Sequence, residues 1–130
     1  MPKLDGVIGR VLIVDDEPNA RTALAELLQT EGYLVATAED GRDALRAYES
    51  FAPHAVVTDV HMPHMDGLDL VRFLRQRSAD LVIIAVTANG AAYCRRAAMR
   101  QGADGYLTKP IDVDHLCLTL TIALEASRRA

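Results

Sequence analysis

Short apolar runs alternate along the chain with segments in which apolar residues recur every three or four positions. The apolar runs have the length of strands and cover residues 10–15, 33–38, 54–59, 81–87 and 105–108. Residues 11–14 and 81–86 are apolar at every position, as is typical of central strands that are covered by helices on both faces. The alternation of strands with helical segments favours an α/β domain built on a parallel sheet.

The segments between the runs predict five helices. The first has apolar residues at the spacing of one helix face, namely Ala20, Ala23, Leu24, Leu27 and Leu28, and Glu31-Gly32 ends it. We expect the second to fifth helices to begin at the capping residues Asp40, Asp66, Asn89 and Asp112, and the fourth to end at Gly102. Crossovers between parallel strands are right-handed, so five such units predict a doubly wound sheet with helices on both faces. Ligands bind such sheets at the carboxyl ends of the strands.

Five polar side chains stand at those strand ends: Asp15, Asp16, Asp59, Thr87 and Lys109. Three converging carboxylates require a cation, since two unit charges ~4 Å apart repel by about 4 kcal/mol even in a moderately screened site. With only oxygen ligands on offer, the expected ion is hard, as Mg²⁺ is. The Thr87 hydroxyl and the Lys109 ammonium are the groups needed to hold phosphoryl oxygens, which leaves Asp59 as the nucleophile. Each residue by itself is more readily explained as a turn, strand-end or surface residue, and only their joint placement favours a site.

Composition narrows the class of protein. With 130 residues the chain is long enough for one domain, and half of its residues are apolar. The net charge of -4 disfavours direct binding of nucleic acid, which requires a surplus of Lys and Arg. Two cysteines without C-x-x-C spacing, and no secretory signal at the start, make a reducing cytoplasm the default expectation. No apolar run approaches the roughly 20 residues of a membrane span.

Four motifs resemble those of the receiver domains of two-component response regulators, over about residues 10–124. They are Val11-Leu12-Ile13-Val14-Asp15-Asp16-Glu17, residues 56–67 around Asp59, Val86-Thr87-Ala88, and residues 102–110, which end in Lys109-Pro110. The resemblance implies a flavodoxin-like fold with strand order 2-1-3-4-5 and five helices, in one receiver domain over residues 1–130 with its core at about 10–126. It also implies a cis peptide bond before Pro110.

The resemblance assigns roles to individual residues. It implies that Mg²⁺, or Mn²⁺, is bound by Asp16 directly, by Asp15 partly through water, by Asp59 and by the backbone carbonyl of His61. Asp59 is then the phosphoryl acceptor, and Thr87 and Lys109 contact the phosphoryl group. The switch aromatic falls on Tyr106, although a half-buried strand aromatic explains that residue almost as well.

The function implied is a signalling switch that accepts a phosphoryl group from a histidine kinase or a histidine phosphotransfer domain. The surface expected to change on phosphorylation is the face formed by the fourth helix, fifth strand and fifth helix. A homodimer through this face is one option, and the output partner or domain is unknown. Such a chain catalyses its own phosphorylation and dephosphorylation and is not a multiple-turnover enzyme. We weighed two rivals, a Mg²⁺-dependent aspartyl-phosphate hydrolase and a flavodoxin-like cofactor binder, and rank both lower. The chain is expected to be either a single-domain regulator or a receiver that forms part of a longer protein, such as a transcription factor or a hybrid kinase.

Overall fold

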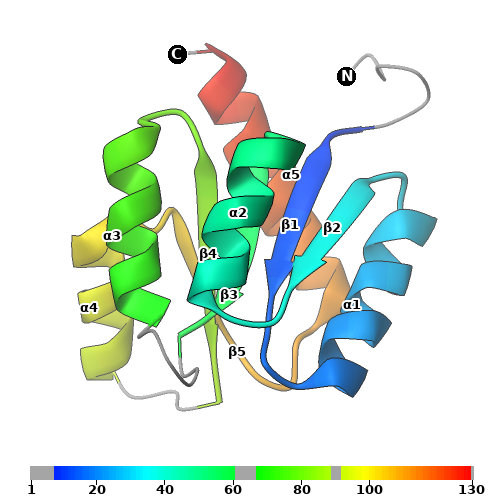
Figure 1. Cartoon of the computed structure of the whole chain (residues 1–130), viewed down its shortest axis with the longest axis horizontal. Helices are drawn as coiled ribbons and strands as arrows, with labels where there is room; N and C mark the ends of the chain where they lie inside the picture. Colours follow the sequence, from blue (N-terminus) through cyan, green and yellow to red (C-terminus); the bar gives the residue numbers. More distant parts are fainter. Residues whose placement is uncertain (1–7, 61–66, 89–91, 130) are drawn as a thin grey trace.

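A parallel sheet of five strands forms the centre of the computed structural model, which describes residues 8–60, 67–88 and 92–129 (Figure 1). The strands are β1 (Arg10–Val14), β2 (Leu34–Ala38), β3 (Ala55–Asp59), β4 (Val82–Thr87) and β5 (Gly105–Thr108). Their order in the sheet is β2-β1-β3-β4-β5, and all neighbouring pairs are parallel. The doubly wound, flavodoxin-like fold predicted from the sequence is therefore confirmed.

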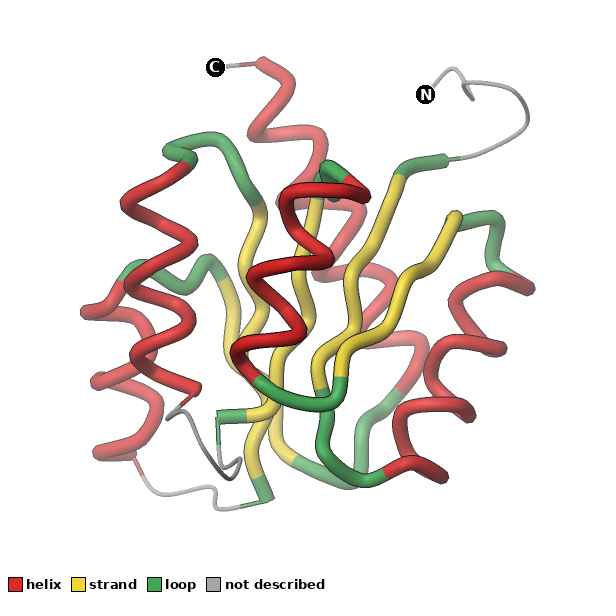
Figure 2. The backbone as a smooth tube through the Cα atoms, viewed as in Figure 1, coloured by secondary structure: helices red, strands yellow, loops and turns green. Residues whose placement is uncertain are grey.

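Helices cover both faces of the sheet (Figure 2). They are α1 (Pro18–Thr30), α2 (Gly41–Phe51), α3 (Gly67–Arg77), α4 (Ala92–Gln101) and α5 (Val113–Arg129). Strand residues alternate between two apolar clusters because successive side chains point to opposite faces. Leu12 and Ile83 pack with residues of α2, α3 and α4, whereas Ile13 and Ile84 pack with residues of α1 and α5. The central strands β1, β3 and β4 are thus buried on both sides, as their unbroken apolar sequences indicate.

The local signals for helix ends are mostly confirmed. The Asp40 side chain accepts a hydrogen bond from the backbone N–H of Asp43 at 2.9 Å, and that of Asp112 accepts one from His115 at 3.2 Å, so both cap a helix start. Gly102 follows α4 with a φ of +118°, the left-handed conformation that favours glycine at this position. The caps expected at Asp66 and Asn89 lie outside the described residues.

The apolar stripe predicted for α1 is only partly buried. Leu28 is fully buried and Leu24 packs against the core, but Leu27 and Ala23 are exposed. Ala23 and Leu27 line an open hollow between α1 and residues 109–113, which lead from β5 into α5. Periodicity alone cannot reveal that two neighbouring elements leave such a gap.

Within the described part of the chain, none of the helices combines the length and the apolar character that crossing a membrane requires.

Candidate functional site

The candidate site lies where the strand order reverses, between the carboxyl ends of β1 and β3. The chain that leaves β1 turns to β2 on one side, while the neighbour of β1 on the other side is β3. Asp15 directly follows β1, and Asp59 is the last residue of β3. The pairing of β1 with β3 therefore brings together side chains that are 44 positions apart in the sequence.

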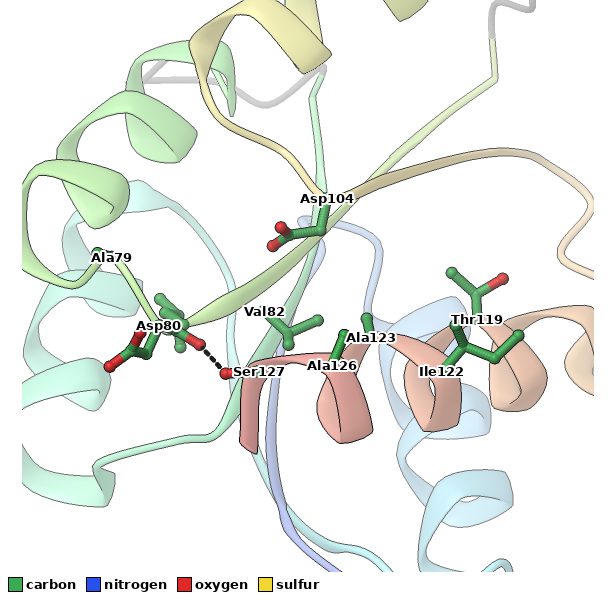
Figure 3. Close-up of a pocket in the computed structure, with 10 residues that line it drawn as sticks. Ala79, Asp80, Val82, Asp104, Thr119, Ile122, Ala123, Ala126 and Ser127 are labelled. Atoms are coloured by element: carbon green, nitrogen blue, oxygen red, sulfur yellow. Dashed lines mark hydrogen bonds between the residues drawn. The ribbon is translucent and has the colours of Figure 1, made fainter. Parts of the chain in front are cut away.

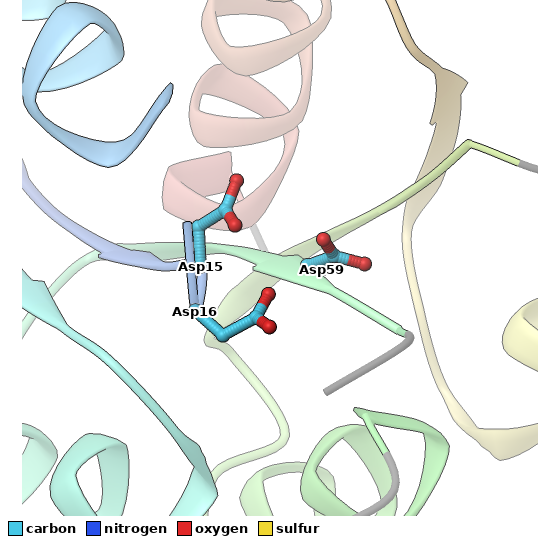
Figure 4. A group of neighbouring side chains, drawn as sticks. All are labelled: Asp15, Asp16 and Asp59. Carbon is cyan, nitrogen blue, oxygen red and sulfur yellow. The ribbon is translucent and has the colours of Figure 1, made fainter. Parts of the chain in front are cut away.

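Three carboxylates gather at this edge: Asp15, Asp16 and Asp59 (Figure 4). One oxygen of each lies within 4.8 Å of one oxygen of each of the others. Asp15 and Asp59 are each only 7% exposed, while Asp16 is exposed to solvent. Buried carboxylates at this separation repel one another unless positive charge is close by.

Lys109 supplies part of that charge. Its Nζ atom donates to Asp15 Oδ2 and to Asp59 Oδ2, both at 3.0 Å. Partial burial lowers the pKa of Lys109, but the hydrogen bonds and charges of Asp59 and Asp15 outweigh this effect, so its pKa is raised above the ordinary value. The ammonium is therefore fully protonated at neutral pH and bridges the two buried carboxylates.

The position of Lys109 depends on the loop after β5. The Lys109-Pro110 peptide bond is cis, as the family resemblance implied. The backbone N–H of Lys109 donates to the carbonyl of Thr87 at 2.8 Å, which ties this loop to the end of β4. The lysine and the threonine predicted to hold phosphoryl oxygens are consequently joined through the backbone.

Thr87 and Tyr106 lie on the same face of the sheet. In the register of β4 and β5, Tyr106 pairs with Ala85, two residues before Thr87. Side chains two residues apart point to one face, and Ala85 belongs to the core cluster under α2, α3 and α4. Thr87 is fully buried and Tyr106 is half-buried. The two residues assigned to a switch are thus neighbours across two strands.

The donor set suits a divalent cation that prefers oxygen. Asp15, Asp16 and Asp59 offer carboxylate oxygens from two adjacent strand ends, with no sulfur or imidazole among them. Such hard ligands in a site with excess negative charge fit Mg²⁺ or Mn²⁺. The remaining ligand expected from the resemblance, the carbonyl of His61, lies outside the described residues.

Two further residues shape the site without having been singled out in the sequence. The Arg21 guanidinium donates to the carbonyl of Asp15 at 2.8 Å, which fixes the backbone of the acidic turn. A cation in the first turn of a helix interacts unfavourably with the helix dipole, so the position of Arg21 in the sequence could have indicated a role outside the helix. Gly67, at the start of α3, packs so closely on the backbone of Asp59 and Val60 that a Cβ atom there would clash with both.

These features define a class of protein: a doubly wound α/β domain with a lysine-bridged acidic cluster at the switch point of its sheet. Residues 11–121 match the family model of the response regulator receiver domain. The chain belongs to this family, whose members are signalling switches and not enzymes acting on small substrates.

Known relatives agree with this assignment. The chain is 44% identical over 107 residues to the response regulator MprA of Mycolicibacterium vanbaalenii, covering 82% of this chain and 46% of that protein. It is 40% identical over 119 residues to the sensor histidine kinase RcsC of Salmonella typhi, covering 92% of this chain and 13% of that protein. It therefore spans about half or less of the curated relatives it matches.

Solved structures show the same fold. A CheY-like receiver domain protein from Methanospirillum hungatei superposes with a TM-score of 0.87 at 25% identity, covering 92% of this chain and 96% of that one. A receiver domain protein from Clostridium thermocellum gives a TM-score of 0.88 at 27% identity, covering 93% and 98% of the two chains.

Proposed function

We propose that the chain is a phosphorylation-operated switch in which Asp59 accepts the phosphoryl group. The observation that carries this proposal is the bond between the buried Asp59 carboxylate and Lys109, inside a cluster completed by Asp15 and Asp16. Asp59 stands at the end of a strand, with the Lys109 ammonium 3.0 Å away and two further carboxylates beside it. This arrangement can neutralise the charge of a phosphoryl group bound there. Burial of this kind is costly for a merely structural residue.

The transfer follows from the groups at the site. A carboxylate oxygen of Asp59 attacks the phosphorus of a phosphohistidine, the new O–P bond forms, and the N–P bond breaks. The departing imidazole keeps the electron pair of that bond and takes up a proton from solvent. Lys109 neutralises charge on the phosphoryl oxygens, and the Thr87 hydroxyl binds one of them.

A divalent ion bound by Asp15, Asp16 and Asp59, with the His61 carbonyl as a further ligand, would neutralise the remaining negative charge in this chemistry. The acidic residues also prevent the chain from binding a phosphoryl group in the absence of such an ion, because like charges would approach closely. We therefore expect phosphorylation of Asp59 to depend on Mg²⁺ or Mn²⁺.

The response to phosphorylation passes along the face that Thr87 and Tyr106 share. When the Thr87 hydroxyl moves towards the phosphoryl group, space opens on this face, and the Tyr106 ring turns inwards to fill it. The surface that changes is formed by α4, β5 and α5. The phosphoryl donor is a histidine kinase or a histidine phosphotransfer domain, and the recipient of the signal is an output partner or domain. We place this exchange in the cytoplasm, with residues 1–130 acting as one receiver domain.

The experiment is phosphorylation of the whole chain with acetyl phosphate in the presence of Mg²⁺, followed by intact-mass measurement. We expect one hydroxylamine-labile phosphoryl group on the wild type and none on Asp59→Asn or in excess EDTA. Asp80→Asn is the matched control, because Asp80 is an exposed aspartate remote from the site, and it should label as the wild type does. Label retained by Asp59→Asn would contradict the assignment.

A further inference from the structure

Arg21, near the start of α1, bonds the backbone of the acidic turn and not its carboxylates. Its Nη1 atom donates to the carbonyl oxygen of Asp15 at 2.8 Å. Within the residues that the structure describes, its guanidinium forms no ion pair with any carboxylate of the site, whereas Lys109 forms two. A cation at this end of a helix also opposes the helix dipole. The bond to the carbonyl is therefore the contact that can explain an arginine here.

Asp15 is held by the chain's own groups at every polar atom. Its N–H donates to the carbonyl of Ala38 at 3.1 Å, and its carbonyl accepts the bond from Arg21. Its Oδ1 atom accepts from the N–H of Glu17 and its Oδ2 atom accepts from Lys109, both at 3.0 Å. The position of Asp15 is consequently fixed in both the backbone and the side chain.

Asp16 has no such support for its side chain. The side chain is exposed, and in the described part of the chain its carboxylate has neither a hydrogen-bond nor an ion-pair partner. Yet this carboxylate lies with those of Asp15 and Asp59, with one oxygen of each within 4.8 Å of one oxygen of the others (Figure 4). The backbone must therefore hold the Asp16 side chain at a place where like charges repel it.

The bond from Arg21 acts on this part of the backbone. The carbonyl of Asp15 and the N–H of Asp16 belong to one planar peptide unit, so fixing the carbonyl oxygen fixes the plane of the whole unit. The orientation of that plane sets the direction in which the Asp16 side chain leaves the backbone. Without the bond the unit can rotate, and repulsion would turn the Asp16 carboxylate out into solvent.

We propose that Arg21 is a positioning residue that holds the Asp16 carboxylate beside Asp15 and Asp59, in place for a divalent cation. The inference rests on the function proposed above, in which these carboxylates bind Mg²⁺. The sign of one effect separates this role from that of a second counter-charge. A counter-charge competes with the cation, so its removal would tighten Mg²⁺ binding, whereas removal of a positioning contact weakens it.

Isothermal titration calorimetry of the whole, unphosphorylated chain with Mg²⁺ tests this role. Arg21→Met keeps the apolar stem and removes the donor, and we expect it to raise the Kd for Mg²⁺ about tenfold. Arg21→Lys keeps the charge and a donor, so its Kd should lie between those of the wild type and Arg21→Met. In the metal-free chain, NMR relaxation of the Asp16 amide nitrogen should show greater mobility in Arg21→Met than in the wild type.

Two matched controls remove the same kind of bond at the opposite edge of the sheet. Arg10→Met, at the start of β1, deletes an equal charge and a guanidinium that donates to the carbonyl of Ala52 at 2.9 Å. Ser127→Ala deletes a hydroxyl that donates to the carbonyl of Asp80 at 2.6 Å, beside a hollow between α5 and the start of β4 (Figure 3). Both variants should bind Mg²⁺ as the wild type does, whatever their change in Tm.

An unchanged Kd in Arg21→Met, with or without a lower Tm, would overturn the proposal and leave Arg21 a structural role only. A tighter Kd would overturn it in favour of a counter-charge, and equal weakening in Arg21→Lys would overturn the role of the carbonyl bond. Failure of the proposed function has a different signature, which is a wild type that binds no Mg²⁺ and accepts no phosphoryl group from acetyl phosphate. That result would overturn both proposals together.

Discussion

Replacing Asp16 by asparagine should stabilise the metal-free chain. The substitution keeps the shape of the side chain and removes one of three negative charges whose oxygens lie within 4.8 Å of one another. At that separation one pair of unit charges repels by about 3 kcal/mol if the effective dielectric constant is about 20, and by about 1 kcal/mol in water. Asp16 is exposed, so the value near that of water applies. Asparagine removes two such repulsions, with Asp15 and Asp59, and one attraction, to the Lys109 ammonium, so we expect a net gain of about 1 kcal/mol in the free energy of unfolding.

The gain should be visible in thermal unfolding followed by circular dichroism in EDTA, where about 1 kcal/mol raises the Tm of a domain of this size by roughly 4 °C. Mg²⁺ should offset this gain, because the ion stabilises the wild type more than the variant. At a concentration about tenfold above the Kd of the wild type, the ion adds about 1.4 kcal/mol to the wild type. It adds only about 0.4 kcal/mol to a variant whose Kd is about tenfold higher. The difference between the two proteins should then nearly vanish.

Asp80→Asn is the control for this experiment, since it removes an exposed charge at the opposite edge of the sheet and should change neither Tm nor the effect of Mg²⁺. A natively folded Asp16→Asn chain that is no more stable than the wild type in EDTA would refute the account of repulsion within the cluster. An equal response of both proteins to Mg²⁺ would show that Asp16 is not a ligand.

Two further substitutions test the frame of the site. Lys109→Gln should lower stability by about 2 kcal/mol at neutral pH, because Asp15 and Asp59 lose their shared cation. Because the pKa of Lys109 is raised in the folded chain, this difference in stability should persist up to a pH equal to the ordinary pKa of 10.5 and disappear as the pH rises through the folded pKa. Urea titrations at several pH values would check this. A difference already lost at pH 9 would contradict the assignment. Gly67→Ala should lower the free energy of unfolding by about 3 kcal/mol, because the added Cβ would clash with the backbone of Asp59 and Val60. An unchanged urea midpoint would show that α3 can move away freely.

Much of the fold could be predicted from the sequence because strand length and burial leave a direct mark on it. Residues 11–14 and 82–86 are apolar at every position, which occurs where both faces of a strand are covered, and they are the buried parts of β1 and β4. The helix caps at Asp40 and Asp112 are equally local, since each side chain bonds a backbone N–H three residues away.

The exposure of helix faces could not be predicted in the same way. Leu27 belongs to a regular apolar stripe but is 44% exposed, because it borders an open hollow between α1 and residues 109–113. On α5 the periodicity indicates the face of Leu116, Leu120 and Leu124, and these three side chains are buried, whereas Leu118 and Ile122 on another face are each 59% exposed. Periodicity gives the faces of a helix, whereas the surroundings decide which face is buried.

By itself the sequence determined which chemical groups stand at the strand ends, because a residue that directly follows an apolar strand must lie at the end of that strand. The rule that ligands bind at the carboxyl ends of parallel strands predicted that Asp15, Asp59 and Lys109 share one edge of the sheet. Only the tertiary structure decided which atoms touch, because the pairing of β1 with β3 places Lys109 Nζ 3.0 Å from both carboxylates. Distances between segments depend on how strands pair and helices pack, and those long-range contacts leave no periodic signal along a chain.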